Sequence, residues 1–401
     1  MAEADCGTQD EKKMRPQIYT ILLLAALHWG CGPRGPVGKG RQFLEMGDLS
    51  RARDQFELAV NSNPRNAEAH FLLAKTYCLA DSAEAAVKEY SILAQLDSRL
   101  ADDTLLRQKV AVFLGEEPYP SVRLTNAPGN DAFPSISADG RWIAFSSKRD
   151  GNPEIYLMSA DGSGQRRLTR NPAIDYGPSF SPDGRRIAFV SDRHGNDELY
   201  IYDLDQGRES RLTRSRTDDF FPRFSPDGQE IFWLSDRGGS YAIWRMDWGG
   251  GAEPDNSPRL FYRCPEGDVA YFDFMPGAIL AQREVKNQGF LFRLTLDGAR
   301  PTDIEFPSFR TGIPTIPLPD GGGVAYVSSR DGNDEIYLYQ LGAKTSVRLT
   351  NHPAEDFVFG FSPDGRKMLF DSRRMGDRDV YLMHLDSLKT REQLLALTNR
   401  P

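Results

Sequence analysis

The stretch PSFSPDGRRIAFVSDRHGNDELYIYDLDQGRESRLT, residues 178–213, decides the fold, because the last two-thirds of the chain repeat variants of it. Five copies have an Asp-Gly turn, and the first two intervals between these turns and the last interval are 44 residues long. The long interval before Gly321 holds a further copy, shortened to Phe274-Met275-Pro276-Gly277. Self-similarity at this period is typical of a propeller or an array. The complete turns end at Gly140, Gly184, Gly228, Gly321 and Gly365.

Each of the six units predicts four short strands. Proline presets its own φ in the Pro182-Asp183-Gly184 turn, and glycine accepts the positive φ at the turn's end. The apolar segments 187–189 and 199–201 then alternate in the manner of strands between neighbouring sheets. Radially arrayed four-stranded sheets bury both faces of every unit. The sequence therefore predicts an all-β six-bladed β-propeller over residues 120–401.

The repeated motif P-x-F-S-P-D-G-x-x-I-A-F-x-S-x-R-x-G-x-x-x-I-Y, followed by R-L-T, resembles the WD-repeat-like blades of the TolB family. The resemblance covers about 122–401. It implies a six-bladed propeller in the bacterial periplasm, a partnership with peptidoglycan-associated lipoproteins or the Tol machinery, and no chemistry. Two segments compete to complete the last blade, VRLT at 122–125 and LLALT at 394–398.

Residues 37–115 predict an all-α module that precedes the propeller. Ala52, Phe56 and Ala59 share one helix face, and apolar residues recur 34 positions later at 86, 90 and 93. The pattern resembles the tetratricopeptide repeat, with His70 in place of the usual aromatic residue and Ser98 in place of a closing proline. Residues 100–114 predict a capping helix. The module is either a simple helical spacer or a peptide-binding groove.

Residues 1–30 predict a targeting signal. Lys12, Lys13 and Arg15 precede a short apolar segment at 18–27, and Gly30-Cys31 resembles the lipobox of bacterial lipoproteins. That resemblance implies lipidation of Cys31 and, with glycine at position 32, anchoring in the outer membrane. The alternatives are a cleaved secretory signal and an uncleaved anchor. In each case the protein is expected in the cell envelope.

In most units an acidic residue lies five positions before an aromatic or aliphatic residue of the first strand. First strands line the channel of a propeller, so these acids are expected to ring one mouth and to attract a cation or a basic peptide. The favoured alternative is that each aspartate satisfies backbone N–H groups of its own loop. A periodic arginine in Ser-x-Arg is expected to tie each hairpin to the next blade. The acids are Asp131, Asp175, Asp219, Asp268 and Asp356, and the arginines are Arg149, Arg193, Arg237, Arg330 and Arg374.

Composition excludes several function classes. The chain has 57 acidic and 49 basic residues, a net charge of -8, which argues against a nucleic-acid binder. The four cysteines and five histidines show no metal-ligand spacing, and no G-x-S-x-G elbow is present. The sequence thus predicts no enzyme, no metal and no cofactor. It predicts an envelope lipoprotein that serves as a protein-interaction scaffold, with a propeller enzyme or a ligand sensor at the channel mouth as the alternative.

Overall fold

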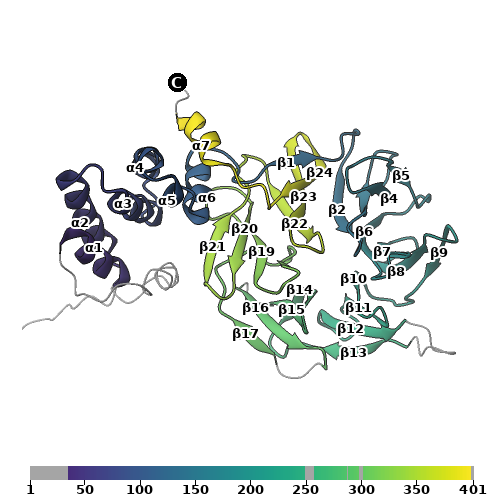
Figure 1. Cartoon of the computed structure of the whole chain (residues 1–401). Coiled ribbons are helices and arrows are strands. Elements are labelled where there is room, and N and C mark those ends of the chain that lie inside the picture. Colours follow the sequence, from purple (N-terminus) through teal and green to yellow (C-terminus); the bar gives the residue numbers. More distant parts are fainter. Residues whose placement is uncertain (1–34, 249–256, 287, 298–300, 399–401) are drawn as a thin grey trace, which may run out of the picture. The chain divides into compact units, whose positions relative to one another are not determined.

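The computed structural model describes residues 35–248, 257–286, 288–297 and 301–398 (Figure 1). The chain folds as two compact units. The described part of the helical unit comprises residues 35–114, 340–345 and 390–398, and the propeller unit comprises Gly115–Tyr339 and Ser346–Lys389. The predicted signal peptide and Cys31 lie outside the described residues. Within those residues, no helix is long and apolar enough to cross a membrane.

The helical unit begins with two helix pairs. Four of its helices begin at a side-chain cap, where Asp48, Asn66, Asp97 and Asp103 each accept a backbone N–H from three residues further on. Such caps satisfy amide groups that the first turn of a helix leaves without partners. The helices before the propeller are α1 (Pro36–Glu45), α2 (Leu49–Ser62), α3 (Ala67–Leu79), α4 (Ala83–Leu96), α5 (Ser98–Ala101) and α6 (Thr104–Phe113).

The 34-residue apolar pattern predicts the buried face of these helices correctly. Ala52, Phe56 and Ala59 are buried in α2, and the residues 34 positions later, at 86, 90 and 93, are buried in α4. Close helix packing is also visible at Gly40, where an added Cβ would overlap the ring of Phe56. The predicted helical module is thus confirmed, and its assignment as a tetratricopeptide repeat stays a prediction.

His70 replaces an expected aromatic residue without leaving its polar atoms unpaired. Its Nδ1 lies 2.6 Å from Oε2 of Glu89 in α4, and its Nε2 lies 3.1 Å from the carbonyl oxygen of Pro64. Both side chains are buried, so the hydrogen bonds offset the cost of removing them from water. The pair joins α3 to α4 where the family pattern would use ring packing.

The end of the chain returns to the helical unit. Residues Arg391–Thr398 form α7, which packs against α4 and α6 and buries Leu394 in the same core as Tyr90. The predicted propeller domain, 120–401, therefore extends too far, and its last strand candidate, LLALT, is helical. The physical reason is spacing, because Leu394 and Leu397 lie three residues apart and share one helix face.

The propeller consists of six antiparallel four-stranded sheets, as predicted (Figure 1). Five of these blades are continuous in sequence, and the sixth takes its outer strand from the beginning of the unit. Blade 1 has β2 (Asp131–Ile136), β3 (Trp142–Ser147), β4 (Glu154–Ser159) and β5 (Arg166–Arg167); blade 2 has β6 (Asp175–Phe180), β7 (Arg186–Ser191), β8 (Glu198–Asp203) and β9 (Arg208–Arg211); blade 3 has β10 (Asp219–Phe224), β11 (Glu230–Ser235), β12 (Ala242–Asp247) and β13 (Arg259–Tyr262); blade 4 has β14 (Asp268–Met275), β15 (Ala278–Val285), β16 (Gln288–Thr295) and β17 (Thr302–Ile304); blade 5 has β18 (Ile316–Pro317), β19 (Gly323–Ser328), β20 (Glu335–Gln340) and β21 (Thr345–Arg348); and blade 6 has β22 (Asp356–Phe361), β23 (Lys367–Met375), β24 (Asp377–His384) and β1 (Ser121–Arg123).

The Ser-Pro-Asp-Gly motif builds the turn between the first two strands of a blade. The Ser181 hydroxyl donates to the Asp183 carboxylate at 2.6 Å and accepts the Arg186 N–H at 3.0 Å. Gly184 ends the turn at a φ of 69°, which favours glycine. The same serine–aspartate bond recurs in three further blades, at Ser137, Ser225 and Ser362. The chemistry of this turn thus explains why the serine, aspartate and glycine recur from blade to blade.

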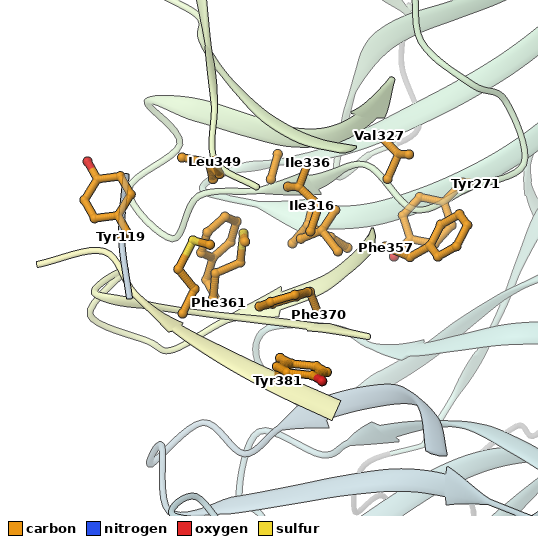
Figure 2. Close-up of a cluster of buried hydrophobic side chains, with 14 residues drawn as sticks. Tyr119, Tyr271, Ile316, Val327, Ile336, Leu349, Phe357, Phe361, Phe370 and Tyr381 are labelled. Atoms are coloured by element: carbon orange, nitrogen blue, oxygen red, sulfur yellow. The ribbon is translucent and has the colours of Figure 1, made fainter. Parts of the chain in front are cut away.

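Neighbouring blades bury one another's faces. Ile187 and Phe189 of β7 pack with blade 1, whereas Ala188 and Val190 of the same strand pack with blade 3. The alternation follows from the two-residue period of a strand. Figure 2 shows the equivalent core between blades 5 and 6, where Phe370 and Tyr381 stack with ring centroids 5.3 Å apart.

β1 closes the ring by pairing antiparallel with β24. Arg123 lies 2.6 Å from Asp379, and the Thr125 hydroxyl donates to Asp379 at 3.3 Å and accepts the Val380 N–H at 3.0 Å. These contacts copy those of Arg167 and Thr169 with Glu154 inside blade 1. Of the two sequence candidates, VRLT at 122–125 therefore completes the last blade.

Replacing Thr125 by valine is expected to weaken ring closure. Valine keeps the shape of threonine but removes the hydroxyl that bonds to Asp379 and Val380, so the free energy of unfolding should fall by about 1–3 kcal/mol. Urea denaturation followed by tryptophan fluorescence measures the change. The matched control is Val122→Thr on the exposed side of β1, which should leave the urea midpoint unchanged. An unchanged midpoint for Thr125→Val would contradict this account of closure.

Candidate functional site: the central channel

The first strands of all six blades surround one cavity of about 490 Å³. The sequence predicts this position for the first strands, and the lining residues confirm it. Bulges interrupt the pairing of the first and second strands in blades 1, 2, 3 and 6, where the channel-lining residues lie. Bulges redirect side chains near functional sites. Each blade contributes to the lining, for example through Ile136, Phe180, Phe224, Phe274, Ile316 and Phe361.

The channel wall is aromatic and partly strained. Phe133 and Phe221 line the cavity with φ of 55° and 53°, a left-handed conformation that bulky residues rarely adopt. Blade 2 has Gly177 at the same place, with a φ of 61°. Each phenylalanine is held by an edge contact, since the Phe133 ring centroid lies 5.4 Å from that of Phe359, and the Phe221 centroid 5.3 Å from that of Tyr271. Strain of about 1–3 kcal/mol per residue is usually retained at binding sites.

One ion pair interrupts the apolar wall. Arg223 of blade 3 lies 3.4 Å from Asp273 of blade 4 and donates to the Tyr271 hydroxyl at 2.6 Å. Arg223 and Asp273 are the charged residues that line the cavity, and the lining includes no histidine, cysteine or lysine. The channel therefore offers apolar contact area with a single oriented guanidinium, a set of groups suited to binding.

Four of the predicted channel-mouth acids do not face the channel. Asp131, Asp175, Asp219 and Asp356 are fully buried, each against the Ser-x-Arg arginine of its own blade. This corrects the expected ring of free carboxylates, and it corrects the expected pairing of the arginine with the next blade. The paired atoms lie 2.8 Å apart for Arg149–Asp131, 3.1 Å for Arg193–Asp175, 2.7 Å for Arg237–Asp219 and 2.7 Å for Arg374–Asp356.

Burial raises the pKa of each of these carboxyls, and the arginine opposes that rise. A hydroxyl that follows the fourth strand of the preceding blade, such as that of Thr169 toward Asp175, also favours the charged form. The acid is thus satisfied by an ion pair and not by the loop amide groups of the favoured alternative. Removing one partner of such a buried pair usually costs about 3–5 kcal/mol.

Blades 4 and 5 depart from this arrangement. Asp268 is exposed at the start of β14, where it accepts the Tyr241 N–H of the preceding blade at 2.8 Å. Arg330 of blade 5 has no aspartate at the corresponding position, and its guanidinium lies 4.2 Å from the ring centroid of Tyr337. The fifth predicted acid is therefore a surface residue that links two blades.

A second buried network was missed by the sequence analysis. Glu154, Glu198 and Glu335 begin the third strands of blades 1, 2 and 5, and all three are fully buried. Each accepts a hydrogen bond from the threonine of the R-L-T element fifteen residues later and pairs with its arginine. The fixed fifteen-residue spacing from glutamate to threonine is the signal that would have found it.

Asp371 is a buried acid that only blade 6 has at this position. Its carboxylate accepts the Phe133 N–H of blade 1 at 3.4 Å. At the equivalent position of blade 1, the neutral hydroxyl of Ser146 accepts the Gly177 N–H of blade 2. Burial raises the pKa of Asp371 to about 7, although Arg378 lies 3.5 Å away and opposes the rise. An acid thus holds the strained Phe133 in the channel wall.

Comparisons with known proteins agree with this architecture. A family model described as the TolB beta propeller domain matches residues 171–257 and 303–396. The propeller is TolB-like. The Tol-Pal system protein TolB of Helicobacter pylori strain 26695 is 33% identical over 76 residues, which cover 19% of this chain and 18% of that protein. The TolB homolog of Chlorobium luteolum is 35% identical over 117 residues, 24% of this chain and 27% of that protein. The chain thus spans about a quarter of the length of these relatives or less.

Solved structures show the same fold at low sequence identity. A putative TolB from Agrobacterium tumefaciens has a TM-score of 0.51 at 19% identity, covering 65% of this chain and 92% of that one. An oligogalacturonate lyase in complex with manganese has a TM-score of 0.50 at 16% identity, covering 68% and 94%. Enzymes therefore share this fold. Within the described residues of this chain, no group of three or more His, Cys, Asp or Glu side chains is placed to hold a metal ion.

Asp371 is expected to make the stability of the TolB-like propeller depend on pH. Its folded pKa of about 7 lies above the unfolded value, so its contribution to stability is present at pH 4 and is lost as the pH rises through 7. Asp371→Asn removes that loss, because an amide does not titrate. The stability of the variant relative to wild type should therefore increase as the pH rises from 4 to 8. Urea midpoints across this range measure the difference.

The control for this pH series is Asp386→Asn, at an exposed position just after β24 of the same blade. Its midpoints should follow those of the wild type at every pH. A constant difference between Asp371→Asn and wild type from pH 4 to pH 8 would mean that the Asp371 carboxyl does not titrate as described.

Proposed function

We propose that this chain is a non-enzymatic bacterial cell-envelope lipoprotein that acts as a protein-interaction scaffold. The observation that carries the proposal is the apolar channel of a TolB-like propeller, walled by phenylalanines and interrupted by the Arg223–Asp273 pair. Nucleophilic catalysis needs a base beside the nucleophile, and the carboxylate among the described lining residues, Asp273, is paired with Arg223. Binding is therefore the activity that these side chains support.

The channel is suited to an extended segment of a partner protein. A cavity of about 490 Å³ lies within the size range of sites that enclose small ligands or a few side chains. Aromatic walls supply contact area at low entropic cost, and the single guanidinium can orient a carboxylate or carbonyl group of the segment. We expect the partner segment to carry apolar side chains and one acceptor group.

The expected location is the periplasm, with the lipidated Cys31 anchored in the outer membrane. Support comes from the basic and apolar segments before Cys31 and from the names of the TolB relatives. Candidate partners are envelope proteins, among them a peptidoglycan-associated lipoprotein or an outer-membrane assembly. The helical unit, whose packing includes both α1 and α7, is proposed as a second docking element. The net charge of -8 makes nucleic acid an unsuitable partner.

Filling the channel is expected to abolish partner binding without unfolding the propeller. Ser135 lines the cavity on β2, so Ser135→Trp places an indole where the partner segment would lie. Full-length protein is used to capture partners from detergent-solubilised envelopes, and wild type should retain envelope proteins that Ser135→Trp loses. The matched control is Arg166→Trp on the exposed outer strand of the same blade, which should capture the same proteins as wild type. Identical capture by Ser135→Trp and wild type would refute docking in the channel.

Cys31→Ser is expected to move the protein from the membrane fraction to the soluble fraction. Serine lacks the thiol that carries the lipid, so incorporation of labelled palmitate should also fall to background. Cys264→Ser, at a buried propeller position, is the control that keeps the label. Membrane retention of Cys31→Ser without label would show that residues 1–30 serve as an uncleaved anchor.

A further inference from the structure

A second cavity, of about 340 Å³, lies between the Asp-Gly turns of blades 2 and 3. Blade 2 contributes Asp183 and Arg186, and blade 3 contributes Asp227, Gln229 and Trp248. None of these residues belongs to the central channel. The cavity is thus a separate site with an aromatic side chain and several planar polar groups.

Trp248 departs from the repeat at this cavity. Its backbone N–H donates to the Gln229 carbonyl at 2.7 Å, the hydrogen bond that Ala160, Leu204 and Leu385 make at the same position of blades 1, 2 and 6. Those blades use a small or aliphatic side chain here, whereas the larger Trp248 packs against Phe224 of the core, with ring centroids 6.3 Å apart. Of these four blades, only blade 3 has an aromatic side chain at this position. Its indole is partly exposed and lines the cavity.

The polar groups are oriented and keep capacity for a ligand. In each turn, Oδ1 of Asp183 or Asp227 is used by a serine hydroxyl and a backbone N–H, and no hydrogen bond within the turn uses the second oxygen. Arg186 is held near the carboxylates of Asp183, at 3.8 Å, and Asp203, at 3.5 Å. Its guanidinium lies 5.8 Å from the centroid of the Trp248 ring. Acceptors and donors thus surround the indole.

The charges indicate the class of ligand. Hydrogen bonds from Ser225 and the Gln229 N–H lower the pKa of Asp227. Burial acts to raise the pKa of Asp183, but hydrogen bonds from Ser181 and the Arg185 N–H hold it below its usual value. Two ionised carboxylates disfavour an anion. Arg186 over the indole disfavours a second cation at the ring. A neutral ligand with many hydroxyl groups satisfies both conditions, because hydroxyls donate to carboxylates and accept from a guanidinium.

We propose that this cavity binds a neutral saccharide, with its C–H face against Trp248 and its hydroxyl groups on Asp183, Asp227 and Arg186. The cavity volume suits one or two sugar rings, given that ligand sites begin at about 300 Å³. This site is independent of the proposed scaffold function, because none of its lining residues lines the central channel and it takes a different class of ligand.

The test is calorimetric titration of the full-length protein with tri-N-acetylchitotriose and with maltotriose, neutral trisaccharides with and without N-acetyl groups. Saturable binding is expected for at least one of them. Trp248→Leu should weaken that binding about tenfold or more, which corresponds to about 1.4 kcal/mol, because it removes the aromatic surface. Leucine is the residue that blades 2 and 6 use at this position, so the melting temperature should stay within a few degrees of wild type.

The matched control is Trp142→Leu, which removes an exposed tryptophan of blade 1 outside the cavity and should leave the affinity unchanged. Trigalacturonate, the acidic counterpart, should bind at least about tenfold more weakly than the neutral sugar, because Asp183 and Asp227 repel it. The proposal is overturned if neither neutral sugar binds, if Trp248→Leu binds as tightly as wild type, or if trigalacturonate binds as tightly as the neutral sugars.

Discussion

Each blade of this propeller depends on its neighbours to remove its two apolar faces from water. Alternate residues of one strand pack in opposite directions, as Ile187 and Ala188 do, so an isolated blade would expose both sets. The arrangement is stable when the ring has no free edge. Closure by β1 is therefore the constraint on which the channel and both candidate sites depend.

The closure uses the same chemistry as the interior of a blade. Arg123 and Thr125 contact Asp379 in the way that Arg167 and Thr169 contact Glu154. Buried carboxylates are costly unless hydrogen bonds and counter-charges satisfy them, so each network fixes the register of the strands that supply its members. The periodic aspartates and arginines thus hold together the strands of single blades, and Arg123 with Asp379 repeats this kind of contact where the ring closes.

Departures from the repeat identify the places where the fold alone does not explain a residue. Phe133 and Phe221 are strained where blade 2 has glycine, and Asp371 stands where blade 1 has a neutral serine. Trp248 occupies a position that other blades fill with alanine or leucine. The strained phenylalanines line the central channel, Asp371 bonds to one of them, and Trp248 lines the cavity between blades 2 and 3.

The sequence by itself determined the number of blades, their turns and the buried faces of the helices, because these depend on contacts between residues close in the chain or at a fixed period. The turn at Pro276-Gly277 is correctly placed even in the degenerate fourth unit. Sequence reasoning failed for partners that only the packing of strands and helices brings together. The pairing of Asp131 with Arg149 depends on how two strands of one blade are brought together, and the helical state of residues 391–398 depends on a core supplied by α4 and α6, about 300 residues earlier. Tertiary structure also decided which end of the propeller completes the last blade, since both candidate strands carry suitable side chains and only one can occupy the edge of β24.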